Sequence, residues 1–263
     1  MSMTKKLVKI IPAIKFVIIF IFFSTLEAKN LQKHDKPGNI ASYFSGILLL
    51  NESKYEESYN YLRKLDGLEK SHINFSSKYT YSLINSGNFN KAFNFSKKMD
   101  LRSSNSFETD LIIGIHYFKN SRFDLAQEYF YKAKKRNSIS VLNNYISDTL
   151  IIWSSLKDSG FEKAKLSIKK LDNRFENLKK IQNVFLHCYF KSADTNKLFS
   201  KLISNQTTDF SRYNYFYAKY LDKTEENQKA EEIVENAIKN YPRNLLLNQY
   251  KIDSSKQKKN IDF

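Results

Sequence analysis

The feature that most constrains this chain is a short pattern that recurs about every 34 residues. Each copy has an aromatic residue, two mostly polar residues and then a small one. Copies start at Tyr55, Phe89 and Phe123, which are evenly spaced, and a fourth starts at Phe161 after a slightly longer step. A recurrence of this length indicates a stack of similar supersecondary units, each of which buries its apolar side against its neighbours.

The same spacing can be continued toward the C-terminus from the small residue Ala164. Leu198 follows Ala164 at the regular interval, and Ala230 follows Leu198 at a slightly shorter one. Six units therefore fit between residues 39 and 244. The longer step before Phe161 predicts a four-residue insertion, which we place in the loop at residues 138–140.

Each unit contains two segments with helical periodicity. In the third unit, residues 107–118 carry apolar side chains three or four positions apart, and residues 123–135 do the same after a polar turn. Small residues such as Gly114 and Ala126 let two helices approach closely, and aromatic residues between them fill the remaining space. With only 6 Gly and 3 Pro in 263 residues, the chain is a poor candidate for an all-β fold, which needs special residues at its turns.

These positions carry a resemblance to a known family. The spacing of the small and aromatic residues resembles the signature of the tetratricopeptide repeat, most clearly at Gly114, Tyr117, Phe123, Ala126, Phe130 and Ala133, and again at Ala230, Ala237 and Pro242. The resemblance covers residues 39–244 and is poorest in the fifth unit. It implies an all-α, right-handed superhelical solenoid of about six helical hairpins that binds a peptide or protein segment along its inner face.

The first 28 residues have the layout of a secretory signal. Lysines at positions 5, 6 and 9 precede an apolar block, Phe16 to Phe23, and Ala28 is the expected last residue removed. The alternative is an uncleaved anchor, which gives possible membrane attachment through the N-terminal segment. We therefore expect a periplasmic or exported protein, or one anchored in the inner membrane and facing the periplasm. A lipoprotein is excluded, since no cysteine follows the apolar block.

The C-terminal residues 245–263 predict a capping element. Residues 244–252 have the pattern of one more amphipathic helix, which would cover the apolar side of the last hairpin. The remainder, from Ser254 to Phe263, is rich in lysine and is expected to form a solvated basic tail.

The sequence offers little for catalysis. It has no phosphate-binding glycine loop, no serine elbow and no His-Glu-x-x-His pattern. His187 and Cys188 are adjacent but point about 100° apart on a helix, so they do not form a metal site, and Cys188 is expected to pack in the interior. We expect no catalytic residue, no metal and no cofactor, and hence not an enzyme.

Binding is the remaining class of function. The family resemblance implies that one residue per first helix lines the inner face, with further residues beside it. The partner would be a protein or peptide, and export argues against nucleic acid. The alternative is a basic module for anionic cell-wall polymer or lipid, because the net charge is +16, or +13 without residues 1–28. The residues expected to line the groove are Tyr43, Ile47, Tyr81, Ile115, Trp153, His187, Lys219 and Lys223, with Lys78, Asn183 and Tyr215 beside them.

Overall fold

The computed structural model describes residues 37–261 except 66, 71, 73, 103, 137, 138 and 206, and side chains from 38 to 254. Every regular element in this part of the chain is a helix, which confirms the all-α prediction. The α-helices are α2 (Pro37–Asn51), α3 (Tyr55–Leu62), α4 (Phe75–Asn85), α5 (Phe89–Leu101), α6 (Phe107–Lys119), α7 (Phe123–Arg136), α8 (Val141–Ser154), α9 (Leu156–Lys170), α10 (Glu176–Tyr189), α11 (Thr195–Ile203), α12 (Tyr213–Lys223), α13 (Asn227–Asn240) and α14 (Leu245–Ile261).

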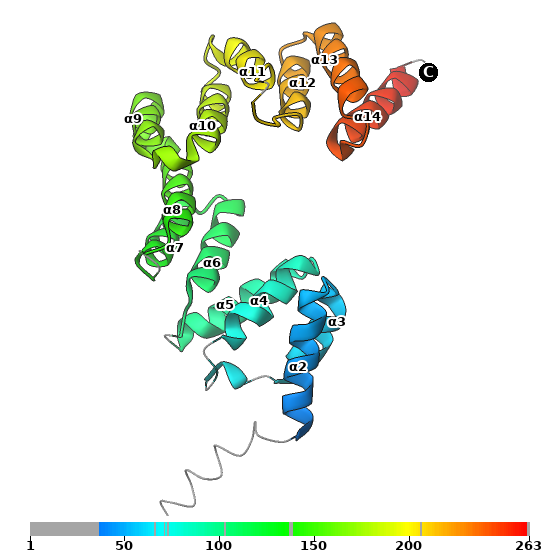
Figure 1. Cartoon of the computed structure of the whole chain (residues 1–263). Coiled ribbons are helices and arrows are strands. Elements are labelled where there is room, and N and C mark those ends of the chain that lie inside the picture. The colour runs from blue at the N-terminus through cyan, green and yellow to red at the C-terminus, as the bar shows by residue number, and fades with distance from the viewer. Residues whose placement is uncertain are drawn as a thin grey trace, which may run out of the picture. The chain divides into compact units, whose positions relative to one another are not determined.

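Successive helices pair as hairpins, in the order α2–α3 through α12–α13 (Figure 1). The hairpins form two compact units, which divide after Arg136. The first unit contains α2 to α7 and the second contains α8 to α14. Within each unit, a hairpin packs against the next one along the chain, as the repeat pattern predicts.

The second helix of each hairpin buries one small side chain. Ser58 in the first hairpin also donates its hydroxyl hydrogen to the carbonyl of Gly46, at 2.8 Å, which ties α3 to α2. In the fifth hairpin the equivalent buried residue is Thr195. The repeat spacing had predicted Leu198 for this place, and that prediction was wrong. The buried small residues are Ser58, Ala92, Ala126, Ala164, Thr195 and Ala230.

The insertion predicted for residues 138–140 lies elsewhere. The connection from α7 to α8 is short, because α7 ends at Arg136 and α8 begins at Val141. The extra residues lie inside the fourth hairpin, where α9 opens with a short helical stretch that is interrupted at Gly160 (φ 69°). Glycine tolerates this left-handed backbone without strain, so the second helix of the hairpin can restart at Phe161.

The last helix packs on the sixth hairpin. Leu247 and Tyr250 of α14 are buried in the same apolar cluster as α12 and α13. The Tyr250 hydroxyl donates to Asp222 Oδ1 at 2.9 Å, and burial together with this bond raises the pKa of Tyr250. The helical backbone runs to Ile261, so the prediction of a solvated tail from Ser254 placed the end of the helix too early.

The predicted leader, residues 1–28, lies outside the described residues. Among the helices that are described, none combines the length and the apolar character needed to cross a membrane.

Candidate functional site

The turn between the two helices of each hairpin provides a common reference point. Each of the six turns has one residue with positive φ, and four of these residues are not glycine. Counting back six positions from this reference gives equivalent places on the first helices, and Ile47, Tyr81, Ile115 and Lys219 all lie there. The six turn residues are Ser53, Gly87, Ser121, Gly160, Lys191 and Glu225.

In the first unit, this position presents apolar surface to solvent. Tyr81 of α4 is 50% exposed and Ile115 of α6 is 46% exposed. The Tyr81 ring meets the Tyr55 ring edge-on at 6.0 Å, and a hydrogen bond with Tyr55 raises the pKa of Tyr81. Ile47 of α2 is half-buried. At this repeat position, the first unit therefore exposes apolar side chains and one tyrosine hydroxyl that is held by a hydrogen bond.

Tyr43 has a different environment from the other predicted groove residues. Its ring lies 4.8 Å from the His72 ring, and the side chain packs against the cluster formed by Leu62, Leu65 and Phe75. Burial raises the pKa of the Tyr43 hydroxyl. Tyr43 thus joins α2 to the start of the next hairpin and leaves only part of its ring accessible.

In the second unit, Trp153 joins two first helices. Its indole Nε1 donates to Gln182 Oε1 of α10 at 2.5 Å, and its ring is edge-on to Tyr189 at 6.4 Å. Trp153 is half-buried, whereas Tyr189 is largely exposed. Neither Gln182 nor Tyr189 was among the predicted site residues. The aromatic ring of Tyr189, two positions before the turn residue Lys191, was the available signal.

His187 lies at a different repeat position from the one predicted. It is buried, its Nδ1 lies 2.9 Å from Ser192 Oγ, and its ring is edge-on to Phe161 at 4.9 Å. Burial lowers the pKa of the His187 imidazole. His187 lies four positions before Lys191, so it corresponds to Tyr117 of the third hairpin, and Phe185 takes the place equivalent to Ile115.

Phe185 is the first member of a row of aromatic side chains in the second unit. Its ring lies 5.4 Å from that of Phe216 on α12, and Phe216 contacts Tyr215 at 5.3 Å. Tyr215 meets Tyr250 of α14 edge-on at 6.4 Å, and the Lys219 ammonium lies 5.0 Å above the Tyr250 ring. Aromatic surface and positive charge are thus combined at the end of the row, where Lys219 is held by a cation–π contact.

The remaining predicted basic residue, Lys223, is exposed at the end of α12. Its charge acts on Cys188, whose pKa is nevertheless raised because burial outweighs the lysine. Cys188 is partly buried against the cluster of α10 to α14, in agreement with a packing role. Among the described residues, no group of three or more histidine, cysteine and acidic side chains is placed to hold a metal ion.

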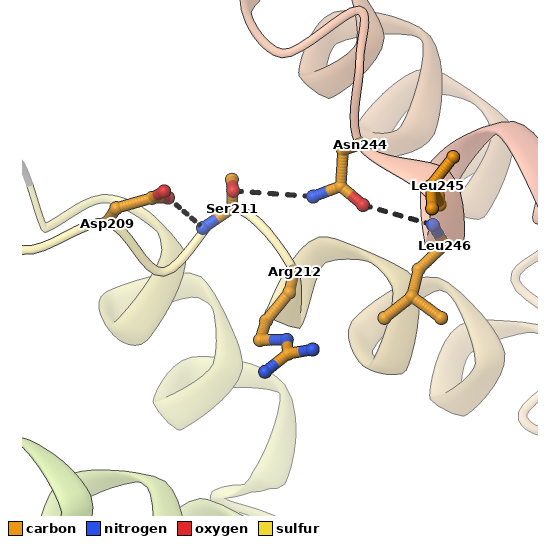
Figure 2. A pocket seen from close by; sticks show the side chains of 6 residues that line it. All are labelled: Asp209, Ser211, Arg212, Asn244, Leu245 and Leu246. Carbon is orange, nitrogen blue, oxygen red and sulfur yellow. Dashed lines mark hydrogen bonds between the residues drawn. The ribbon is translucent and has the colours of Figure 1, made fainter. Parts of the chain in front are cut away.

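A pocket of about 490 Å³ lies where the connection before α12 meets the start of α14, and none of the predicted groove residues lines it. Figure 2 shows Asn244 between Ser211 and Leu246. Asn244 Nδ2 donates to Ser211 Oγ at 3.4 Å, and Asn244 Oδ1 accepts from the Leu246 N–H at 3.1 Å. Asp209 Oδ1 accepts from the Ser211 N–H at 2.8 Å. These polar groups are used to cap α14 and to join it to the connection before α12.

Comparison with known proteins identifies the fold. The sequence matches no protein-family model and no curated protein. Among solved structures, a tetratricopeptide repeat protein from Parabacteroides merdae is similar at 13% identity and a TM-score of 0.61, over 86% of this chain and 88% of that one. NprR in complex with its cognate peptide NprX is similar at 14% identity and a TM-score of 0.54, over 87% of this chain and 75% of that one. The apo form of the quorum sensor NprR from B. thuringiensis is similar at 12% identity and a TM-score of 0.53, over 90% of this chain and 74% of that one.

The chain therefore has the tetratricopeptide repeat fold, built from helical hairpins. At these identities the likeness concerns the fold.

Proposed function

We propose that this protein is a non-catalytic scaffold that binds a peptide or protein segment on the first helices of its hairpins. The observation that carries the proposal is the pair Tyr81 and Ile115, two large side chains that are about half exposed at equivalent positions of successive hairpins. Aromatic and aliphatic side chains that repeat along a preformed surface give affinity without a large ordering cost. The fold likeness to NprR, which was solved with its cognate peptide, supports the same interpretation.

In the second unit, the proposed contacts are Trp153, Phe185, Lys219 and Lys223. The aromatic members supply rigid contact area, and the two lysines favour a segment that carries acidic groups at that end. His187 is too deeply buried to present much surface to a partner.

The proposed place of action is the bacterial cell envelope. Residues 1–28 would direct export and then be removed, or remain as an inner-membrane anchor with the repeats facing the periplasm. Fractionation of cells that express the full chain, followed by mass measurement of its N-terminus, tests this part. Recovery of the protein with an intact Met1 in the cytoplasmic fraction would contradict it.

The binding proposal is tested by capture of partners from envelope extract. Tyr81→Ala and Ile115→Ala should each reduce capture, and the double variant should reduce it further. Tyr131→Ala is the matched control, because Tyr131 is similarly exposed but lies on a second helix, α7. Equal capture by all variants would contradict the proposed face.

The same capture separates the scaffold from a basic module for anionic wall polymer or lipid. Binding that depends on Tyr81 and Ile115 should change little between low and moderate salt. Binding by dispersed lysines should weaken steeply over that range, because salt screens exposed charges.

A further inference from the structure

The first described helix, α2, has an apolar ridge on its outer face. Ile40, Phe44 and Leu48 follow one another at every fourth position and are 48%, 66% and 60% exposed. Side chains four positions apart form a continuous row on a helix surface, the kind of ridge that packs into another helix.

In the third hairpin the equivalent residues contact the hairpin before it. Ile112 lies two repeats after Phe44, and it packs against a cluster that includes Phe95 and Met99 of α5. His116, two repeats after Leu48, stacks on Phe93 of α5 at 3.6 Å. The α2 ridge is therefore a stacking surface of the repeat, and no described hairpin precedes it.

The charge of α2 sets it apart from the rest of the chain. None of its 15 residues is Lys, Arg, Asp or Glu, although charged residues make up 27% of the sequence. A chain with a net charge of +16 opposes its own association wherever like charges are brought together. At α2, a second copy can approach without placing any charged side chain of one α2 against the other.

Other parts of the same chain are poor covers for this ridge. Residues 29–36, which precede α2 after the predicted cleavage, contain three lysines, one aspartate and one leucine. The last helix of the chain, α14, exposes Leu245 and Ile252 but also Lys251, so a head-to-tail contact would set a charged lysine beside the apolar ridge.

The ridge is also self-complementary. Phe44 lies midway between Ile40 and Leu48, so two antiparallel α2 helices related by a twofold axis at Phe44 bring Ile40 of each copy against Leu48 of the other. Ala41 and Ser45, which have small side chains, follow Ile40 and Phe44 in the sequence, so the ridge of a second copy can pack beside them. We propose that two copies of this protein associate through α2, with Phe44 at the centre of the contact. This proposal goes beyond the scaffold function and does not depend on it.

Sedimentation of the purified protein, with or without residues 1–28, tests the proposal. The unsubstituted protein should have twice the mass of one chain, and Phe44→Asp should halve that mass without loss of helicity. Leu101→Asp is the matched control, since Leu101 is 84% exposed at the end of α5, outside the ridge. The Leu101→Asp variant should keep twice the mass of one chain. A monomeric unsubstituted protein, including one whose N-terminal segment covers α2, or a Phe44→Asp variant that stays dimeric, would overturn the proposal.

Cross-linking provides a second readout if Phe44→Asp fails to fold. In a Cys188→Ser background, Ser45→Cys lies next to the proposed axis and should form a disulfide-linked dimer on oxidation. Asn51 is exposed at the end of the same helix. Asn51→Cys should not form a disulfide-linked dimer, because the two copies of residue 51 would lie about 20 Å apart. Equal cross-linking at both positions, or none at Ser45→Cys, would overturn the arrangement.

Discussion

A β-carbon on Gly114 would lie 2.5 Å from Cε1 of Phe130, so α6 and α7 meet at a point where only glycine fits. Gly46 has the same relation to Leu62 in the first hairpin, where a β-carbon would lie 2.6 Å from Leu62 Cδ2. Phe130 and Leu62 are both fully buried, so neither side chain has room to move aside. The close approach of the two helices is thus set by one small residue and one large residue on opposite helices.

Gly114→Ala should therefore destabilise the first unit. Overpacking a filled interior costs about 1–3 kcal/mol, which exceeds the gain in helix propensity from alanine. Gly38→Ala is the control, because no heavy atom lies within 4 Å of the added β-carbon, and it should leave stability unchanged or slightly higher. Urea denaturation of the two variants makes the comparison. Adding Phe130→Leu to Gly114→Ala should recover part of the loss, and equal effects of the two alanine substitutions would contradict the steric explanation.

The positive-φ turn residues predict a stabilising substitution. Lys191 has φ 53°, a conformation that costs a side chain about 1–2 kcal/mol, and glycine adopts it freely. Lys191→Gly should therefore raise the free energy of unfolding, and Gly87→Ala (φ 75° at present) should lower it. Lys169→Gly in the exposed part of α9 is the control and should destabilise by about 1 kcal/mol. A loss of stability in Lys191→Gly would show that the lysine side chain outweighs the backbone strain.

The ion pair between Asp110 and Arg136 predicts an asymmetry between its two partners. Arg136 Nε donates to the fully buried Asp110 carboxylate, which also accepts from Asn105, while Arg136 itself is partly exposed. Arg136→Met should cost about 3 kcal/mol, because it leaves a buried charge without its counter-charge. Combining it with Asp110→Asn should restore part of that stability in thermal unfolding. If the double variant is no more stable than Arg136→Met alone, the unpaired charge is not the cause.

Much of the fold could be predicted because the repeat positions have strong steric requirements. Gly114, Ala126 and Phe130 each occupy a place that few other side chains fill, so their spacing indicated hairpins directly. The fourth hairpin could not be placed as well. Its extra residues form helix up to Gly160, and a helical insertion inside a hairpin has the same local pattern as the helix it extends.

The fifth hairpin shows why the site was harder to predict than the fold. Thr195 is as well buried as the alanines at equivalent positions. Threonine is polar and common on protein surfaces, so the sequence did not indicate that it packs in the interior here. Choosing Leu198 instead shifted the register of this hairpin and assigned His187 to the groove position, whereas counting back six positions from the turn residue Lys191 gives Phe185. Tyr81 and Ile115 escaped this error because their turns, at Gly87 and Ser121, have the regular spacing.

The buried imidazole of His187 predicts how stability changes with pH. Burial lowers the pKa of His187, the Lys165 charge acts in the same direction, and Asp194 and Glu162 oppose them with a smaller effect. Between the lowered pKa of the folded state and the ordinary value of 6.5, the unfolded state binds a proton that the folded state does not. The contribution of His187 to the free energy of unfolding should therefore be complete above pH 6.5 and should fall as the pH drops through that window.

The measurement is the Tm of the unsubstituted protein and of His187→Asn from about pH 8 to about pH 5, the range in which histidines titrate. Asparagine keeps a polar atom near Ser192 Oγ but does not titrate, and His72 and His116 are present in both proteins. The difference between the two curves thus reports His187 alone, and the unsubstituted protein should lose more Tm on acidification. Parallel curves would mean that the imidazole is protonated equally easily in the folded and unfolded chains, which contradicts the burial described above.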